Sequence, residues 1–165
     1  MRVSKDGAFG ELRPYRHGFR VEAEIEFDHP LIGKQELSLD IEPNSFRREI
    51  ARARTFGFMR DVEKLRAAGL ARGGSVENCV VLDDRGVVNG PLRFKDEFVR
   101  HKILDLLGDL ALIGRPLVGE ITSHRAGHAM HSRFVETILP VVASESPAPP
   151  RHPPPATRSA RSRES

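Results

Sequence analysis

The chain has 165 residues, of which 39% are hydrophobic and 30% charged, and this fits one soluble domain of ordinary size or a little more. Its apolar runs are far shorter than the roughly 20 residues of a membrane-spanning helix, and its first residues lack the apolar core of a secretory signal. One cysteine, Cys79, excludes a disulfide framework and a cysteine-rich zinc cluster. The net charge is +3, and no long basic helix or aromatic-basic strand pattern supports nucleic-acid binding.

The first clear element is a strand at residues 19–27, FRVEAEIEF, in which every second side chain is apolar. This alternation is typical of a half-buried strand, and Pro30 ends it because proline cannot continue the hydrogen-bond ladder. A second strand is expected at residues 35–42, QELSLDIE. The two strands therefore predict a hairpin.

A helix is expected to follow, with Ser45 as its N-cap and FRREIARAR as its body. The cap is partial, because Arg48 occupies the position of the acid in a capping box. The stretch TFGF at 55–58 breaks this helix, and a short helix at about 60–68 ends at Gly69. Residues 78–84, NCVVLDD, then predict a short strand that turns at Arg85 and Gly86.

A long helix is predicted from about residue 96 to 113, with Gly114 as its C-terminal cap. A strand at about 117–123 and a helix at roughly 126–138 complete the order β-β-α-(insert)-α-β-α. This order predicts an α+β domain, with helices layered on a sheet, over residues 1–140 and an insert at about 58–91. Residues 141–165 form a tail rich in Pro, Arg and Ser, which predicts disorder.

The long helix carries polar residues at steps of four, namely His101, Asp105 and Asp109. This spacing places them on one side of the helix, opposite an apolar stripe. They are either solvated polar residues or part of a metal site. Phe98 and Leu104 lie near the same side, so the face is not purely polar, and acids among apolar neighbours need a partner, a proton or a metal.

A second polar group is the stretch HRAGHAMH at residues 124–131, with histidines at spacings of four and three. These histidines are either metal ligands or the polar first turn of a helix. Histidine is a common general acid near neutral pH, so His128 is also a candidate for that role.

Several ordered blocks of the chain resemble one family, the zinc-dependent UDP-3-O-acyl-N-acetylglucosamine deacetylases of lipid A biosynthesis in Gram-negative bacteria. These blocks are IEFDHP at 25–30, EIARARTFGFMRDVEKLRAAGLARGGSVEN at 49–78, VVLDD at 80–84, LRFKDEFVRHKILDLLGDLALIGRPLVG at 92–119 and GHAMH at 127–131. The resemblance covers nearly all of residues 1–140. It implies one of the two similar domains of the family's β-α-α-β sandwich, with a small α/β insert.

The resemblance also implies roles for individual residues. His101 and Asp105 would be two of three ligands to Zn²⁺, and the insert would form an apolar passage for the acyl chain. His128 would be the general acid, with Asp109 as its charged partner, and Thr55 would polarise the amide carbonyl. Substrate contacts are implied for Lys102 with phosphate, Phe27 with uracil, and Glu26 beside it.

The resemblance matches only the second of the family's two domains. The third zinc ligand and the glutamate base belong to the first domain and have no counterpart here. The predicted function is therefore cytoplasmic hydrolysis of the N-acetyl group of UDP-3-O-acyl-N-acetylglucosamine, the committed step of lipid A biosynthesis, with a separate N-terminal domain chain as a partner. The alternative is a catalytically inactive remnant that binds a UDP-lipid or a protein. An RNA or membrane contact through the arginine-rich tail is a third, weaker hypothesis.

Overall fold

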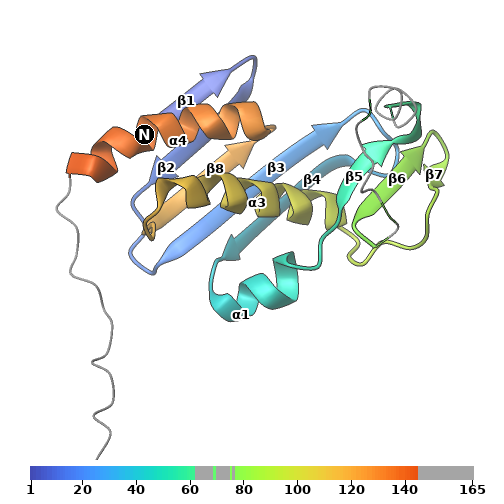
Figure 1. The fold of residues 1–165 in the computed structure, drawn as a ribbon, viewed down its shortest axis with the longest axis horizontal. Helices are drawn as coiled ribbons and strands as arrows, with labels where there is room; N and C mark the ends of the chain where they lie inside the picture. The colour runs from blue at the N-terminus through green and yellow to red at the C-terminus, as the bar shows by residue number, and fades with distance from the viewer. Residues whose placement is uncertain (62–68, 70–74, 76, 145–165) are drawn as a thin grey trace, which may run out of the picture.

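The structure, a computed structural model, describes residues 1–61, 69, 75 and 77–144. The strands of its main sheet are β1 (Arg2–Lys5), β2 (Ala8–Arg13), β3 (Phe19–Phe27), β4 (Gly33–Asp40) and β8 (Gly119–His124). They are arranged in the order β1-β2-β8-β3-β4, and the helices α3 (Glu97–Leu110) and α4 (His128–Ser144) run across one face (Figure 1). This arrangement confirms the expected α+β class with helices packed on a sheet.

The predicted hairpin forms one side of this sheet, with β4 as an edge strand. β3 pairs antiparallel with β4, and β8 lies parallel to β3 on the other side. Val21, Ala23 and Ile25 of β3 are buried, as the alternation predicted, whereas Glu22 and Glu24 between them are only partly covered. β4 begins and ends about two residues earlier than the sequence pattern indicated.

The hairpin of β1 and β2 was not predicted. Lys5 pairs with Ala8 across a two-residue turn in which both Asp6 (φ 51°) and Gly7 (φ 82°) have positive φ. An Asp-Gly pair favours this type of turn, because aspartate and glycine tolerate the left-handed region better than other residues. The hairpin extends the sheet beyond β8 and forms part of the surface under α4.

The helix after β4 differs from the prediction in its start and its length. It consists of α1 (Pro43–Ser45) and the π-helical turn η1 (Phe46–Ile50), and its N-cap is Glu42 rather than Ser45. Ser45 lies three residues later and accepts a hydrogen bond from the Glu42 backbone N–H at 2.9 Å. The predicted partial cap at Ser45 is therefore wrong: the structure has a capping box with the acid, Glu42, at the cap position and the serine in the first turn.

A second, smaller sheet contains β5 (Thr55–Phe58), β6 (Cys79–Asp83) and β7 (Gly86–Val87). Residues 55–58 are thus a strand, parallel to β6, and not only a break after the preceding helix. The turn at Arg85 and Gly86 is confirmed, because both backbone N–H groups donate to Asp83 Oδ1 at 2.8 Å. Residues 62–68 of the predicted helix at 60–68, and residues 145–165 of the tail, lie outside the described residues.

The two long helices bury their apolar faces against the main sheet. α3 continues into the 3₁₀ turn η2 (Ala111–Ile113) and ends at Gly114, whose φ of 71° confirms the predicted C-terminal cap. α4 runs from His128 to Ser144, six residues beyond the predicted end. The predicted stripe of α3 is confirmed, and the shared core is made mainly by Val21, Ile25, Ile103, Leu106, Leu110, Ile121, Phe134 and Ile138.

Among the described residues, no helix combines the length and the apolar composition that crossing a membrane requires.

Candidate functional site between two helices

The polar residues of α3 form a partly buried row along the side that faces away from the apolar stripe. The side chains of His101 and Asp105 are each 13% exposed, and that of Asp109 is 20% exposed. Phe98, one turn before His101, is fully buried. The row is therefore not a solvated face, and its charged groups require partners.

At one end of the row, Asp105 has two positively polarised partners. Its Oδ1 lies 3.1 Å from His101 Nε2, and its Oδ2 accepts a hydrogen bond from Lys102 Nζ at 2.9 Å. Burial alone would raise the pKa of the Asp105 carboxyl, but the hydrogen bonds from His101 and Lys102 outweigh it and hold the pKa far below the ordinary value. Asp105 is therefore an ionised carboxylate at neutral pH.

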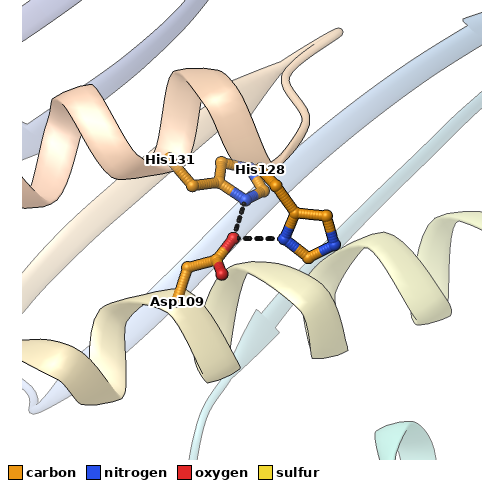
Figure 2. A group of neighbouring side chains, drawn as sticks. All are labelled: Asp109, His128 and His131. Atoms are coloured by element: carbon orange, nitrogen blue, oxygen red, sulfur yellow. Dashed lines mark hydrogen bonds and ion pairs between the residues drawn. The ribbon is translucent and has the colours of Figure 1, made fainter.

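At the other end of the row, α4 brings two histidines to Asp109 (Figure 2). His128 Nδ1 and His131 Nδ1 each lie 2.8 Å from the same oxygen, Asp109 Oδ2. His128 is the first residue of α4, and its Nε2 lies 3.8 Å from Asp105 Oδ2. Asp105 and Asp109 therefore belong to one continuous polar site between α3 and α4.

The histidines of residues 124–131 are divided between two faces of the molecule. His128 and His131 lie in this site, but His124 ends β8, stacks on Phe9 at 5.0 Å between ring centroids and pairs with Glu24 at 3.3 Å. The interpretation of all three as one set of ligands is therefore wrong. The reason is that β8 ends at His124 and α4 begins only at His128, so the three do not share one helix.

Asp109, His128 and His131 form a group of the kind that can hold a metal ion, because one ligand atom from each lies within 4.8 Å of the others. The family resemblance implied individual roles for Asp109 and His128, whereas His131 was indicated only as one of three histidines that were either metal ligands or part of a polar first turn. The spacing of three residues between the two histidines was visible, but the approach of both to Asp109 depends on how α4 packs on α3.

The residues expected to contact substrate lie around a hollow next to His101. This hollow has a volume of about 210 Å³, and it is lined by Ile25, Glu26, Phe27, Lys102, Arg125 and Ala126. Glu26 forms an ion pair with Arg125 at 3.4 Å. The structure thus brings Lys102, Glu26 and Phe27 together, and it adds a second cation, Arg125, that the sequence did not indicate.

Aromatic rings connect this hollow to His101. The ring of Phe56 lies 5.4 Å from that of Phe27, 6.3 Å from that of His101 and 5.5 Å from Lys102 Nζ. Thr55 precedes Phe56 and is exposed at the start of β5. Thr55 therefore belongs to the same strand as Phe56, and this strand, β5, is the wall of the site beside the hollow.

A buried ion pair holds this wall in place. Glu97, with no exposed surface, accepts hydrogen bonds from the Arg54 backbone N–H (3.0 Å), Arg54 Nε (2.9 Å) and the Arg93 backbone N–H (2.6 Å). Burial would raise the pKa of Glu97, but the bonds from Arg54 and Arg93 lower it below the ordinary value. The pair joins the start of β5 to the start of α3, and no pattern in the sequence indicated it.

The fold and the site define a class of protein in which histidines and carboxylates on two helices create a centre suited to metal binding and acid–base chemistry, beside a cationic and aromatic hollow. Comparison with known proteins is more specific. Residues 1–140 match the family model described as LpxC: UDP-3-O-acyl N-acetylglycosamine deacetylase, and the chain belongs to this family.

Curated relatives support the same assignment. The UDP-3-O-acyl-N-acetylglucosamine deacetylases of Brucella ovis, Brucella canis and Brucella abortus are each 52% identical to the chain over 141 residues. The matched region is 84% of this chain and 49% of each relative. The chain therefore spans about half the length of the curated relatives it matches, and the resemblance inferred from the sequence is confirmed.

Proposed function

We propose that this chain supplies the C-terminal half of a zinc-dependent deacetylase that hydrolyses the N-acetyl group of UDP-3-O-acyl-N-acetylglucosamine, in the cytoplasm and as the committed step of lipid A biosynthesis. Family membership and the relatives' names support the deacetylase activity. The observation that carries the proposal for this chain is the pairing of His101 with an ionised Asp105 beside a hollow that contains Lys102.

The proposed zinc ligands are His101 and Asp105. Two ligands of one tetrahedral Zn²⁺, each about 2.0–2.1 Å from the metal, lie about 3.3 Å apart. The 3.1 Å between His101 Nε2 and Asp105 Oδ1 is near this spacing, and a bound metal would replace the hydrogen bond from Nε2–H to the ionised Asp105 carboxylate. When bound, the metal supplies Lewis acidity: it polarises the amide carbonyl and lowers the pKa of its water.

The chain alone is expected to hold zinc weakly. Two ligands do not complete a zinc site, which needs a third protein ligand. A histidine that binds through Nε2 also keeps its proton on Nδ1, and His101 Nδ1 is buried without a hydrogen-bond partner among the described residues. We propose that the third ligand and the glutamate base come from the part of the relatives' length that this chain does not match.

His128 is the proposed general acid. Asp109 accepts the Nδ1 proton of His128 and stabilises the ring when it is positively charged. Nε2 then carries the proton that the departing amine requires, and the His128 side chain is 66% exposed, so a substrate can reach it. Thr55 is proposed to donate its hydroxyl to the amide carbonyl oxygen as negative charge develops there.

The hollow beside His101 is proposed to bind the UDP group. Phe27 offers an aromatic surface for uracil, Lys102 offers a cation for phosphate, and Glu26 lies next to both. Lys102 already lies between this hollow and Asp105, 2.9 Å from Asp105 Oδ2. A phosphate bound by Lys102 would therefore lie beside Asp105, one of the proposed metal ligands. The insert at about 58–91 is proposed to contact the acyl chain.

The test is reconstitution with the other half. The chain is co-expressed with the N-terminal half of the Brucella ovis relative, and the purified pair is assayed for zinc content and for release of acetate from UDP-3-O-acyl-N-acetylglucosamine. We expect both in the wild-type pair and neither with His101→Ala. His17→Ala, which removes an exposed histidine, is the matched control and should retain both. A stable pair that neither retains zinc nor releases acetate would refute the proposal.

The alternative, an inactive remnant that binds a UDP-lipid or a protein partner, is favoured by one observation. The whole proposed UDP hollow lies within the described residues, whereas only two of the three zinc ligands do. Isothermal titration of the chain with the UDP-linked substrate decides it. Binding without turnover, also in the reconstituted pair, supports the alternative, and absence of binding rejects its UDP-lipid form.

A further inference from the structure

We propose that His131 is a positioning residue: it holds the Asp109 carboxylate in place and so fixes the orientation and the protonated nitrogen of His128. This inference rests on the proposed function, because it concerns the pair of residues that would deliver the proton. It gives an individual role to His131, which the sequence indicated only as one of three histidines that were either metal ligands or part of a polar first turn.

The geometry separates the two histidines of α4 by their surroundings. They are three residues apart and therefore lie on the same side of the helix, and both Nδ1 atoms approach Asp109 Oδ2 at 2.8 Å (Figure 2). The His131 residue is 2% exposed, whereas the His128 side chain is 66% exposed. His131 is thus a fixed contact of Asp109, and His128 is the accessible one.

The protonation of His131 follows from its burial. Burial lowers the pKa of His131 below the ordinary value despite the hydrogen bond to Asp109, so the ring is neutral at neutral pH and carries one proton. The 2.8 Å contact with a carboxylate oxygen requires that proton on Nδ1. Nε2 then carries no proton and is only an acceptor. Because Nε2 is buried and has no partner among the described residues, this state avoids a buried N–H group without an acceptor.

The same distances indicate that hydrogen bonds account for the contacts at Asp109 without a metal. A contact of 2.8 Å is the ordinary length of an N–H···O⁻ hydrogen bond. Two ligands of one zinc ion would lie about 3.3 Å apart. A metal bound through His131 Nδ1 would also move the proton to the buried Nε2, where the described residues offer no acceptor.

The consequence reaches His128 through Asp109. With one N–H donor fixed in the interior, Asp109 Oδ2 remains directed at α4 and accepts the Nδ1 proton of His128. His128 Nε2 is then directed away from Asp109 and toward Asp105, whose Oδ2 is 3.8 Å away. Without His131, the carboxylate's remaining partner among the described residues would be the exposed His128 ring, and His128 would lose its preference for the proton on Nδ1.

The first test is ¹⁵N NMR of the imidazole groups of the 165-residue chain, which needs no enzymatic activity. We expect His131 to be neutral with its proton on Nδ1, and His128 to prefer the same protonated nitrogen when neutral. His131→Leu should reduce that preference of His128. His131→Asn, which retains an N–H donor near the position of Nδ1, should restore it. His124→Leu, the same change on the other face, is the matched control and should leave His128 unchanged.

Three outcomes would overturn the proposal: a proton on Nε2 of His131, an unchanged His128 in His131→Leu, or ligation of His131 during titration with Zn²⁺. Circular dichroism identifies which variants are folded. If His131→Leu does not fold, the result for His131→Asn still decides the test. In the reconstituted pair, His131→Leu should lower kcat on the order of tenfold to a hundredfold with little change in KM. If the pair has no activity, the proposed function fails, but the NMR result still decides the role of His131.

Discussion

Replacement of Glu97 by glutamine should be among the most destabilising single changes in the described part of the chain. Glu97→Gln preserves the size of the side chain but removes its charge. Glu97 has no exposed surface, and its oxygens accept three hydrogen bonds from Arg54 and one from the Arg93 backbone. The amide of glutamine would place an NH₂ group against donors where a carboxylate oxygen now accepts.

The expected cost follows from the position of the partner. Arg54 is only 7% exposed, and its guanidinium would keep the Pro91 carbonyl as an acceptor at 2.9 Å but lose the charge of Glu97. Breaking a buried ion pair on one side leaves an uncompensated charge and costs about 3–5 kcal/mol. The loss should depend on pH. The lowered pKa of Glu97 means that its stabilisation is present at neutral pH and disappears as the pH falls below about 4.3, its unfolded value, and through the folded one.

The assay is equilibrium unfolding of the chain in urea at neutral pH, with Glu136→Gln as the matched control. Glu136 is exposed on α4, and its replacement should change the free energy of unfolding by no more than about 0.5 kcal/mol. If Glu97→Gln costs less than about 1 kcal/mol, the hydrogen bonds to Arg54 and Arg93 do not have the role assigned to them. The wall that carries Thr55 would then be held by other contacts.

Three further predictions concern the core, the metal and the pH dependence. Phe134→Ala should lower the free energy of unfolding by about 3–5 kcal/mol, because the ring is 1% exposed and packs on Gly10; a cost near zero would contradict this packing of α4. The chain alone should bind Zn²⁺ weakly in competition with a chromophoric chelator, and Asp105→Ala should abolish that binding; affinity equal to that of a complete zinc site would refute the two-ligand interpretation. Burial lowers the pKa of His131, so the unfolded chain takes up a proton more readily than the folded chain. The free energy of unfolding should therefore decline as the pH falls below about 6.5, and His131→Asn should reduce this decline. If urea unfolding shows the same dependence of this free energy on pH in both proteins, the contribution of His131 is excluded.

The elements that the sequence predicted well are those with a long and regular pattern. β3 alternates over nine residues, and α3 carries an apolar stripe ended by a glycine, so the side chains alone define which face is buried. The hairpin of β1 and β2 was missed because each strand is short and partly polar, although Asp6 and Gly7 carried a turn signal. β5 was missed because its partner, β6, is more than twenty residues away and no local pattern reports a parallel pairing.

The site was predictable to the extent that one helix determines it. Steps of four residues placed His101, Asp105 and Asp109 on one side of α3, and the resemblance assigned them roles. The contribution of α4 was not predictable in the same way. Whether His124, His128 or His131 meets Asp109 depends on where β8 ends and on the packing of α4 against α3 and the sheet. These are tertiary facts that spacing along the chain does not contain.

Asp105 and Asp109 lie one helical turn apart on α3, and the roles proposed for them differ: metal binding for Asp105 and support of the general acid for Asp109. Asp105 has its histidine partner on its own helix, and Lys102 beside it leads to the hollow proposed for phosphate. Asp109 has both of its histidine partners on the other helix. A shift of α4 along α3 would therefore disturb the proposed acid while leaving the proposed metal ligands together. We infer that variants at the contact between the helices will reduce proton delivery before they reduce zinc retention in the reconstituted pair.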